Sequence, residues 1–221
     1  MNTLYQFLNA AFCVVVVVSN IISAKMVQLP IFYDFSIPAG LITYPLTFLL
    51  SDLVTEIFGA KKARLMVYNA LAMNILSFGI IQLALILPNS IEEEQQAFKA
   101  VLALSGLRIF SSLTAYIVAQ IVDIQLYALI KSWTGSRFLW LRNNGSTCVS
   151  QLIDTVLIDI IFLYWGLEMG FREVVGIMLI SYMYKALFSF AITPLFYLAV
   201  FLVKTNWNFK YRQGVVYESK M

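Results

Sequence analysis

The sequence has 221 residues, of which 61% are hydrophobic and 12% are charged, and its formal net charge is +3. Its mean hydropathy is +0.81, whereas soluble domains are about half apolar and about a quarter charged. The composition therefore predicts an integral membrane protein. The sequence contains no histidine, which excludes a histidine-ligated zinc or haem, a Ser-His-Asp triad and a histidine proton relay.

Apolar stretches predict one membrane domain, 1–221, with an all-α fold of six transmembrane helices, each needing about 20 mostly apolar residues to cross a bilayer. The predicted helices lie at about 4–24, 37–58, 65–87, 109–131, 147–165 and 174–203. Residues 91–96 are predicted to form a solvated turn, and the short apolar segment at about 97–107 is expected to lie in the membrane interface. The segments left outside the membrane are too short for an attached ATPase, kinase or nucleic-acid-binding module.

Lysine and arginine residues are distributed unevenly between the two ends of the predicted helices. Cytoplasmic loops are enriched in these residues. Ten of them fall on the side that holds both termini: Lys61, Lys62, Arg64, Lys131, Arg137, Arg142, Lys204, Lys210, Arg212 and Lys220. Four fall on the other side: Lys25, Lys99, Arg108 and Arg172. We therefore expect cytoplasmic N and C termini in a multi-pass protein of the cell inner (plasma) membrane.

Charged side chains inside the predicted helices mark a candidate site, because a charge at bilayer depth costs several kcal/mol and usually faces the bundle interior with a partner. They are Asp52, Glu56, Asp123, Asp154, Asp159 and Lys185. Helical spacing places most of them on polar faces. The residues that share such faces are Ser112, Tyr116, Gln120, Asp123 and Tyr127; then Thr147, Ser150, Gln151 and Asp154; then Ser181, Lys185, Ser189 and Thr193.

Other charged positions are expected to lie away from this site. Asp159 is rotated away from Asp154 on a regular helix. Glu56 is expected to snorkel or to have a cap-side role at the cytoplasmic end of its helix rather than to contact a ligand. Asp154 and Lys185 are natural partners, either in a ligand site or in a purely structural ion pair. A cavity with several carboxylates, one ammonium and many aromatic rings suits a flat polar heterocycle, because a carboxylate accepts two parallel hydrogen bonds from a guanine-like edge.

Two runs of residues carry a family resemblance. The first is Ile37-Pro38-Ala39-Gly40 followed by Tyr44-Pro45-Leu46-Thr47-Phe48, and the second is Ser51-Asp52-Leu53 followed by Glu56-Ile57-Phe58-Gly59-Ala60. With Asn143-Asn144-Gly145-Ser146-Thr147 leading to Asp154-Thr155, and Lys185, they resemble the queuosine precursor transporters. These are vitamin-uptake-type membrane proteins that import 7-deazaguanines, and the resemblance covers about residues 10–200.

The resemblance implies import of preQ0, preQ1 or queuine for salvage into tRNA, without choosing among these bases. By motif position it implies a substrate site with a polar core and neutral contacts. The polar core is Asp52, Asp123, Asp154 and Lys185, and the neutral contacts are Asn20, Tyr116, Gln120 and Gln151. We expect no enzymatic activity, no cofactor, no metal and no nucleic-acid partner. The expected partners are the small-molecule substrate and membrane lipid.

Other interpretations stay open. The chain could be the substrate-binding S-component of an ATP-driven vitamin uptake complex, but the Ala-x-x-x-Ala spacing common on the first helix of such components is absent here, so a separate energising subunit is not expected. It could import another flat heterocycle or be a structural membrane subunit. An intramembrane aspartyl protease is a remote alternative, because no aspartate lies in a Gly-x-Gly-Asp element. The sequence decides neither the coupling to protons nor whether homo-oligomers form.

Overall fold

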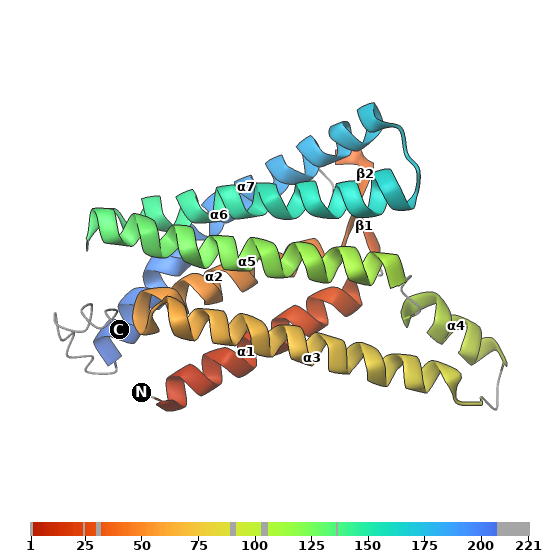
Figure 1. The fold of residues 1–221 in the computed structure, drawn as a ribbon, viewed down its shortest axis with the longest axis horizontal. Coiled ribbons are helices and arrows are strands. Elements are labelled where there is room, and N and C mark those ends of the chain that lie inside the picture. The colour runs from red at the N-terminus through yellow and green to blue at the C-terminus, as the bar shows by residue number, and fades with distance from the viewer. Residues whose placement is uncertain are drawn as a thin grey trace.

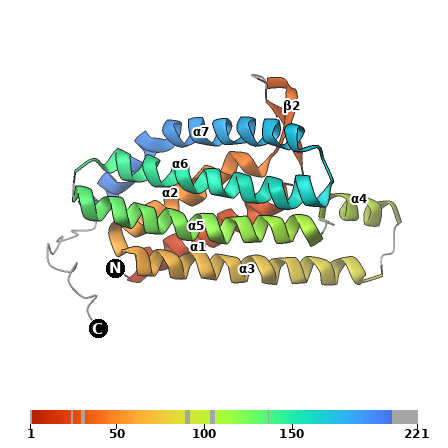
Figure 2. The ribbon, with the colours of Figure 1, turned by 45° about the horizontal axis from the view of Figure 1, so that its top comes forward.

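The computed structural model describes residues 2–23, 25–29, 32–88, 92–102, 106–135 and 137–206. Long helices lie side by side in a bundle, with a short hairpin and one short helix at the same end (Figures 1 and 2). The helices are α1 (Asn2–Ile22), α2 (Gly40–Phe58), α3 (Ala60–Ile86), α4 (Glu92–Leu102), α5 (Gly106–Thr134), α6 (Leu139–Ile158), its π-helical continuation η1 (Asp159–Gly166), and α7 (Phe171–Asn206). The strands are β1 (Met26–Leu29) and β2 (Phe32–Pro38).

Five helical segments in the described residues are long and apolar enough to cross a membrane. They are Thr3–Ile22, Ala60–Ile86, Phe110–Thr134, Leu139–Gly166 and Phe171–Val203. The remaining predicted helix, 37–58, corresponds to α2. It is not among these five, and it packs against α1, α3, α5 and α7. The chain is therefore a multi-pass helical membrane protein, and five of the predicted spans are confirmed as helices of sufficient length.

The position of α2 follows from its sequence, because apolar and polar residues both need burial there. Phe48, Leu53 and Val54 are buried, and Leu53 and Val54 join a core that includes Phe12 of α1 and Val67 of α3. The polar positions of α2 are buried as well: Thr47, Ser51, Asp52, Thr55 and Glu56. α2 thus carries a row of polar groups into the middle of the bundle.

The outer helices show the opposite pattern, with large apolar side chains exposed along one face. On α3 these include Leu76, Ile80 and Leu83, and on α7 they include Leu179 and Leu187. Such contiguous apolar surface is typical of a membrane-facing helix rather than of a soluble protein. The lipid-facing surface and the polar interior are therefore clearly separated.

A short strand hairpin is added to the predicted all-α fold, whose other described elements are helices. β1 and β2 pair antiparallel, with Met26 opposite Pro38 and Val27 opposite Ile37. The helix predicted from residue 37 therefore begins only at Gly40. The physical reason is Pro38, which disfavours helical backbone in the residue before it, after a run rich in aromatic residues that suit a strand.

Two other predicted boundaries are wrong. The stretch predicted as a turn is helical from Glu92, the start of α4, because Glu and Gln are good helix formers and acidic side chains suit a helix N-terminus; Ile91 lies outside the described residues. α6 begins at Leu139 rather than at 147. Gly135, with φ of 60°, and Phe138, with φ of 55°, form the sharp turn between α5 and α6. Arg142, counted above as a loop cation, is therefore buried inside α6.

Candidate functional site

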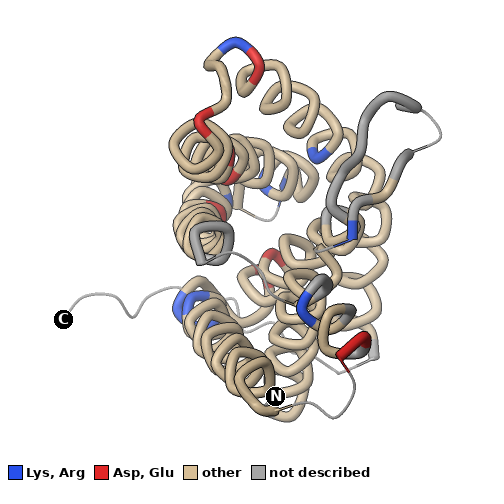
Figure 3. The backbone as a smooth tube through the Cα atoms, turned by 90° about the vertical axis from the view of Figure 1, so that its right-hand side faces the viewer, with Lys and Arg blue, Asp and Glu red and all other residues tan. Residues whose placement is uncertain are grey.

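Charged and polar side chains from α2, α5, α6 and α7 meet inside the bundle. Viewed along the helices, acidic and basic positions lie within the bundle as well as at its rim (Figure 3). In the described part of the chain, the buried charged residues are Asp52, Glu56, Asp123, Arg142, Asp154, Asp159 and Lys185. All of them except Asp159 fall into three groups, which differ in how completely their polar atoms are paired.

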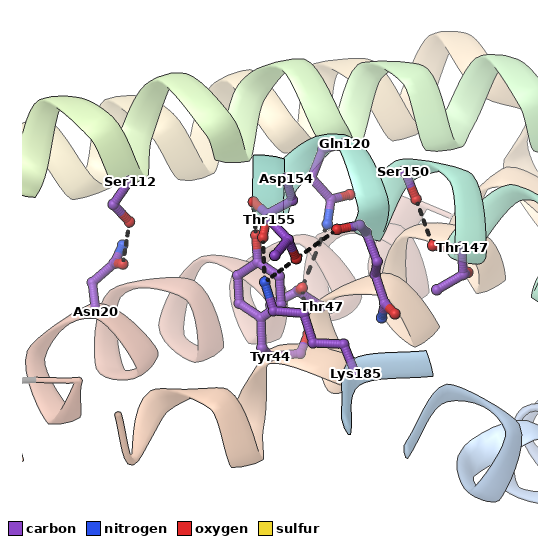
Figure 4. Close-up of polar contacts among 11 residues, drawn as sticks. Asn20, Tyr44, Thr47, Ser112, Gln120, Thr147, Ser150, Asp154, Thr155 and Lys185 are labelled. Atoms are coloured by element: carbon purple, nitrogen blue, oxygen red, sulfur yellow. Dashed lines mark hydrogen bonds and ion pairs between the residues drawn. The ribbon is translucent and has the colours of Figure 1, made fainter. Parts of the chain in front are cut away.

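The first group is the ion pair between Asp154 of α6 and Lys185 of α7 (Figure 4). Lys185 Nζ lies 2.8 Å from Asp154 Oδ2 and donates to Thr155 Oγ1 at 3.0 Å. The hydroxyl of Tyr44, on α2, donates to Asp154 Oδ1 at 2.6 Å. The predicted need of Lys185 for an acidic partner is confirmed. Three helices are joined at this point, and both carboxylate oxygens of Asp154 have a donor.

The second group is a pair of carboxyl groups, Asp52 on α2 and Asp123 on α5. Both residues are fully buried, and they lie between two α2–α5 hydrogen bonds, Gln120 to Thr47 on one side and Tyr127 to Glu56 on the other. Ser150 Oγ donates to Asp123 Oδ1 at 2.9 Å. No donor from the described residues reaches Asp123 Oδ2 or either oxygen of Asp52. Two ionised carboxylates are acceptors only, so a hydrogen bond between these two carboxyl groups requires a proton on one of them.

The third group surrounds Glu56, near the end of α2. Glu56 Oε1 lies 3.0 Å from Arg142 Nη2, and Glu56 Oε2 lies 3.0 Å from Lys131 Nζ. Tyr127 OH donates to Glu56 Oε2 at 3.2 Å, and Arg142 Nη1 donates to the carbonyl oxygen of Gly135 at 2.7 Å. Glu56 is only 4% exposed. The prediction that it snorkels is wrong, because the α5–α6 turn places two cations over it.

Neutral polar groups lie beside these charges. Gln120 Nε2 donates to Thr47 Oγ1 at 3.4 Å, and Thr47 Oγ1 donates to the carbonyl oxygen of Tyr44 at 2.6 Å. Gln120 Oε1, Tyr116 OH and both amide atoms of Gln151 are buried without a partner from the described residues. Unpaired buried polar atoms are costly and rare in native proteins. They are therefore the atoms best suited to contact a bound ligand.

Asn20 is the one predicted site residue that lies apart from these groups. Its Nδ2 donates to Asn74 Oδ1 at 2.7 Å, and its Oδ1 accepts from Ser112 Oγ at 3.3 Å. Figure 4 shows the Asn20 and Ser112 side chains set apart from the Asp154–Lys185 pair. Asn20 joins α1, α3 and α5, and the structure does not bring it to the carboxyl groups.

The remaining predicted site residues come together: Asp52, Tyr116, Gln120, Asp123, Gln151, Asp154 and Lys185 are all buried. The sequence interpretation missed Arg142, although Arg142, Ser146, Ser150 and Asp154 follow one another at four-residue intervals. Residues four apart share a helix face, so a helix started at 139 would have placed Arg142 on the polar side.

Asp159 also differs from its prediction. It is 7% exposed at the start of η1, where the helix changes to π geometry. It interacts electrostatically with Lys185 and Asp154 rather than facing away from them. Its Oδ2 has no partner in the described part of the chain. π-helical segments occur often at functional sites, and this one continues the helix that carries Gln151 and Asp154.

Comparisons with known proteins assign the chain to a family. A family model described as "Putative vitamin uptake transporter" matches residues 38–199. That span includes every residue of the three groups. The chain therefore belongs to this family.

The chain is also similar to two named transporters. The "Probable queuosine precursor transporter" of Bacillus subtilis (strain 168) is 31% identical over 143 residues, which is 64% of this chain and 61% of that protein. The "Queuosine precursor transporter" of Escherichia coli (strain K12) is 27% identical over 197 residues, which is 85% of this chain and 82% of that protein. The first match thus spans less than two thirds of the relative. No solved structure matches the chain.

Proposed function

We propose that this chain imports queuosine precursors, 7-deazaguanine bases such as preQ0, preQ1 or queuine, across the cell inner membrane for salvage into tRNA. Membership of the vitamin uptake family and the names of both relatives support this assignment. The observation that carries it is the set of buried polar atoms without partners on α2, α5 and α6. A carrier that alternates between empty and loaded states needs such atoms, because the substrate is their partner.

The chemistry of these atoms matches a guanine-like edge. The ring N–H and the exocyclic amine of such a base donate two parallel hydrogen bonds, which one carboxylate, Asp52 or Asp123, can accept. The amide of Gln151 offers both a donor and an acceptor for the carbonyl oxygen and the remaining ring edge. Tyr116 supplies an aromatic face and a free hydroxyl nearby on α5. We assign these residues, with Gln120, to substrate contact.

The Asp154–Lys185 pair has a different role in this proposal. Both oxygens of Asp154 already have donors from Lys185 and Tyr44. We therefore assign the pair to holding α2, α6 and α7 around the substrate, and to releasing them when the carrier changes state. Asn20 is assigned to the packing of α1, α3 and α5, in line with its bonds to Asn74 and Ser112.

We further propose six spans with both termini in the cytoplasm, α2 being the sixth span. The start of α1, the end of α7 and the α2–α3 and α5–α6 connections lie at one end of the bundle (Figure 1). Lys61, Lys62 and Arg64 begin α3 at that end, and Arg137 lies in the α5–α6 turn. Enrichment of positive residues on one side supports a cytoplasmic location for it. Lys131 and Arg142 are weaker support, since both pair with Glu56.

An assay in cells tests the function. The chain is expressed alone in a bacterial strain that neither makes nor imports these bases but can insert them into tRNA. The strain is fed preQ0, preQ1 or queuine, and queuosine in tRNA is read on a boronate gel. We expect modified tRNA with at least one base in cells that carry the chain, and none in cells that lack it.

The assay includes one site variant and one control. Asp52→Asn is expected to abolish the signal, whereas Glu93→Gln, at an exposed position of α4, is expected to preserve it. No modified tRNA with any base, despite confirmed membrane expression, would contradict import by this chain alone and would indicate a requirement for a separate energising subunit.

A further inference from the structure

The Asp52–Asp123 pair lacks the paired cation that Asp154 and Glu56 have. Asp154 is matched by Lys185. Glu56 is matched by both Lys131 and Arg142. No ion pair from the described residues involves Asp52 or Asp123, although both are fully buried and lie between the α2–α5 hydrogen bonds of Thr47 and Glu56. Asp52 and Asp123 therefore form a buried pair of acids with no ion-pair partner among the described residues.

Counting the neighbouring charges shows how this imbalance is resolved. Arg142 and Glu56 both interact electrostatically with Asp52. The group contains three acids, Asp52, Glu56 and Asp123, and two cations, Lys131 and Arg142, so its net charge is −1 when all five are ionised. One proton on the Asp52–Asp123 pair makes the whole group neutral. Like charges a few ångströms apart in a dry interior do not both persist, and sharing one proton is the usual outcome.

The other elements packed around the pair do not supply the missing charge. From α5, Tyr127 is committed to Glu56. From α7, Lys185 is committed to Asp154 and Thr155, and from η1, Asp159 adds a further acid near Lys185. α1 and α3 contribute no buried charged side chain among the residues that the structure describes. A proton is therefore the simplest cation that balances the pair.

We propose that Asp52 and Asp123 hold one shared proton, and that this proton enters the cell together with each imported base. This inference rests on the proposed import function. The proton is taken from the external water and released to the cytoplasm, so no other reactant is needed. With the proton and an uncharged base such as preQ0 bound, the centre is neutral and the helices can rearrange. Without the proton, a net negative charge remains buried, and rearrangement is strongly disfavoured.

Transport by the purified chain in liposomes tests the coupling. Counterflow of preQ0, preQ1 and queuine is measured first, with no pH gradient, because exchange of one base for another needs no net proton movement. Net accumulation is then measured with the membrane potential clamped at zero and the outside more acidic than the inside. For one proton per base, we expect accumulation to rise by up to about tenfold per pH unit, and to collapse with a protonophore.

The possible results separate the two proposals. Counterflow without any response to the pH gradient would overturn the coupling and leave the import function intact. Absence of counterflow with all three bases would overturn the import function and the coupling with it. Accumulation that follows the gradient supports both.

A second measurement locates the proton without depending on transport. The infrared spectrum of the purified protein at neutral pH should contain a protonated-carboxyl band that shifts in D₂O. We expect the band to lose intensity in Asp52→Asn and in Asp123→Asn, and to persist in Asp154→Asn, whose carboxylate is paired with Lys185. A band that is unchanged in both variants of the pair would overturn the assignment of the proton to it.

Discussion

Lys185 of α7 reaches Asp154 of α6 with 2.8 Å between Nζ and Oδ2, and Tyr44 of α2 completes the contact from the other side. Three helices are therefore held by one buried ion pair. Because Asp154 and Lys185 are both buried, each of these two charged side chains depends on the other for its stability. The first prediction concerns this dependence.

Removing one partner of the pair should destabilise the protein more than removing both. Lys185→Met leaves the Asp154 carboxylate buried without its cation, which costs about 3–5 kcal/mol in comparable pairs. The double variant with Asp154→Asn should regain much of this loss. The measurement is thermal unfolding of the purified protein in detergent, with the exposed Lys99→Met as control. A single variant as stable as the wild type would contradict the buried ion pair.

Arg142 and Lys131 both bind Glu56, but they should not contribute equally. The Arg142 side chain is 2% exposed and the Lys131 side chain is 25% exposed. Solvent screens the more exposed pair, so Arg142→Met should lower the unfolding temperature more than Lys131→Met does. Arg137→Met, at an exposed position in the same turn, should have little effect. Equal effects of the Arg142 and Lys131 variants would show that burial does not govern this network.

Gln151→Leu should separate function from stability. Both amide atoms of Gln151 lack a partner from the described residues, so the substitution removes unsatisfied polar atoms and should leave stability unchanged or slightly increased. Uptake should fall at least about tenfold if the amide hydrogen-bonds the base, since a net hydrogen bond of about 1.4 kcal/mol corresponds to that factor. Unfolding temperature and uptake are measured on the same preparations.

The control for this variant is Gln125→Leu, which makes the same change at an exposed position of α5. This control should alter neither the unfolding temperature nor the uptake. Uptake by Gln151→Leu at the wild-type level would remove Gln151 from the substrate site.

Gly40→Ala should disturb the junction between α1 and α2. A Cβ at Gly40 would overlap the carbonyl oxygen of Ser19 and the hydroxyl of Ser23, and backbone cannot move aside easily. Gly79→Ala is the matched control, because a Cβ there meets nothing within 4 Å, and alanine stabilises a helix interior by about 0.5–1 kcal/mol. Thermal unfolding should therefore shift down for the first variant and up for the second. Equal stability of the two variants would contradict the close approach of α1 and α2.

The sequence predicted the polar side of the bundle well, because helical spacing alone places residues on a face. Of the stripe predicted on α5, Tyr116, Gln120, Asp123 and Tyr127 are buried, and Ser112 is half-buried. The partner of Lys185 was predicted as well, since a cation at bilayer depth requires an acid. The placement of Asp52 and Asp123 between the same two α2–α5 hydrogen bonds could not be predicted, because it depends on how α2 and α5 pack.

The errors come from helix boundaries and long-range contacts. Starting α6 at 147 hid Arg142 and led to the wrong role for Glu56, whose partners lie 75 and 86 residues away in the chain. The β1–β2 hairpin was missed because a short apolar run gives the same hydropathy in a strand as in a helix. Asn20 resembled a site residue by motif position, but its partners are Asn74 and Ser112.

Uptake of a labelled base by liposomes that contain this purified chain and no other protein tests the central claim most directly. The account predicts saturable uptake of at least one of preQ0, preQ1 and queuine, competed by the unlabelled base and lost in Asp52→Asn. Uptake of all three bases at the level of empty liposomes, from protein shown to be folded, would contradict it.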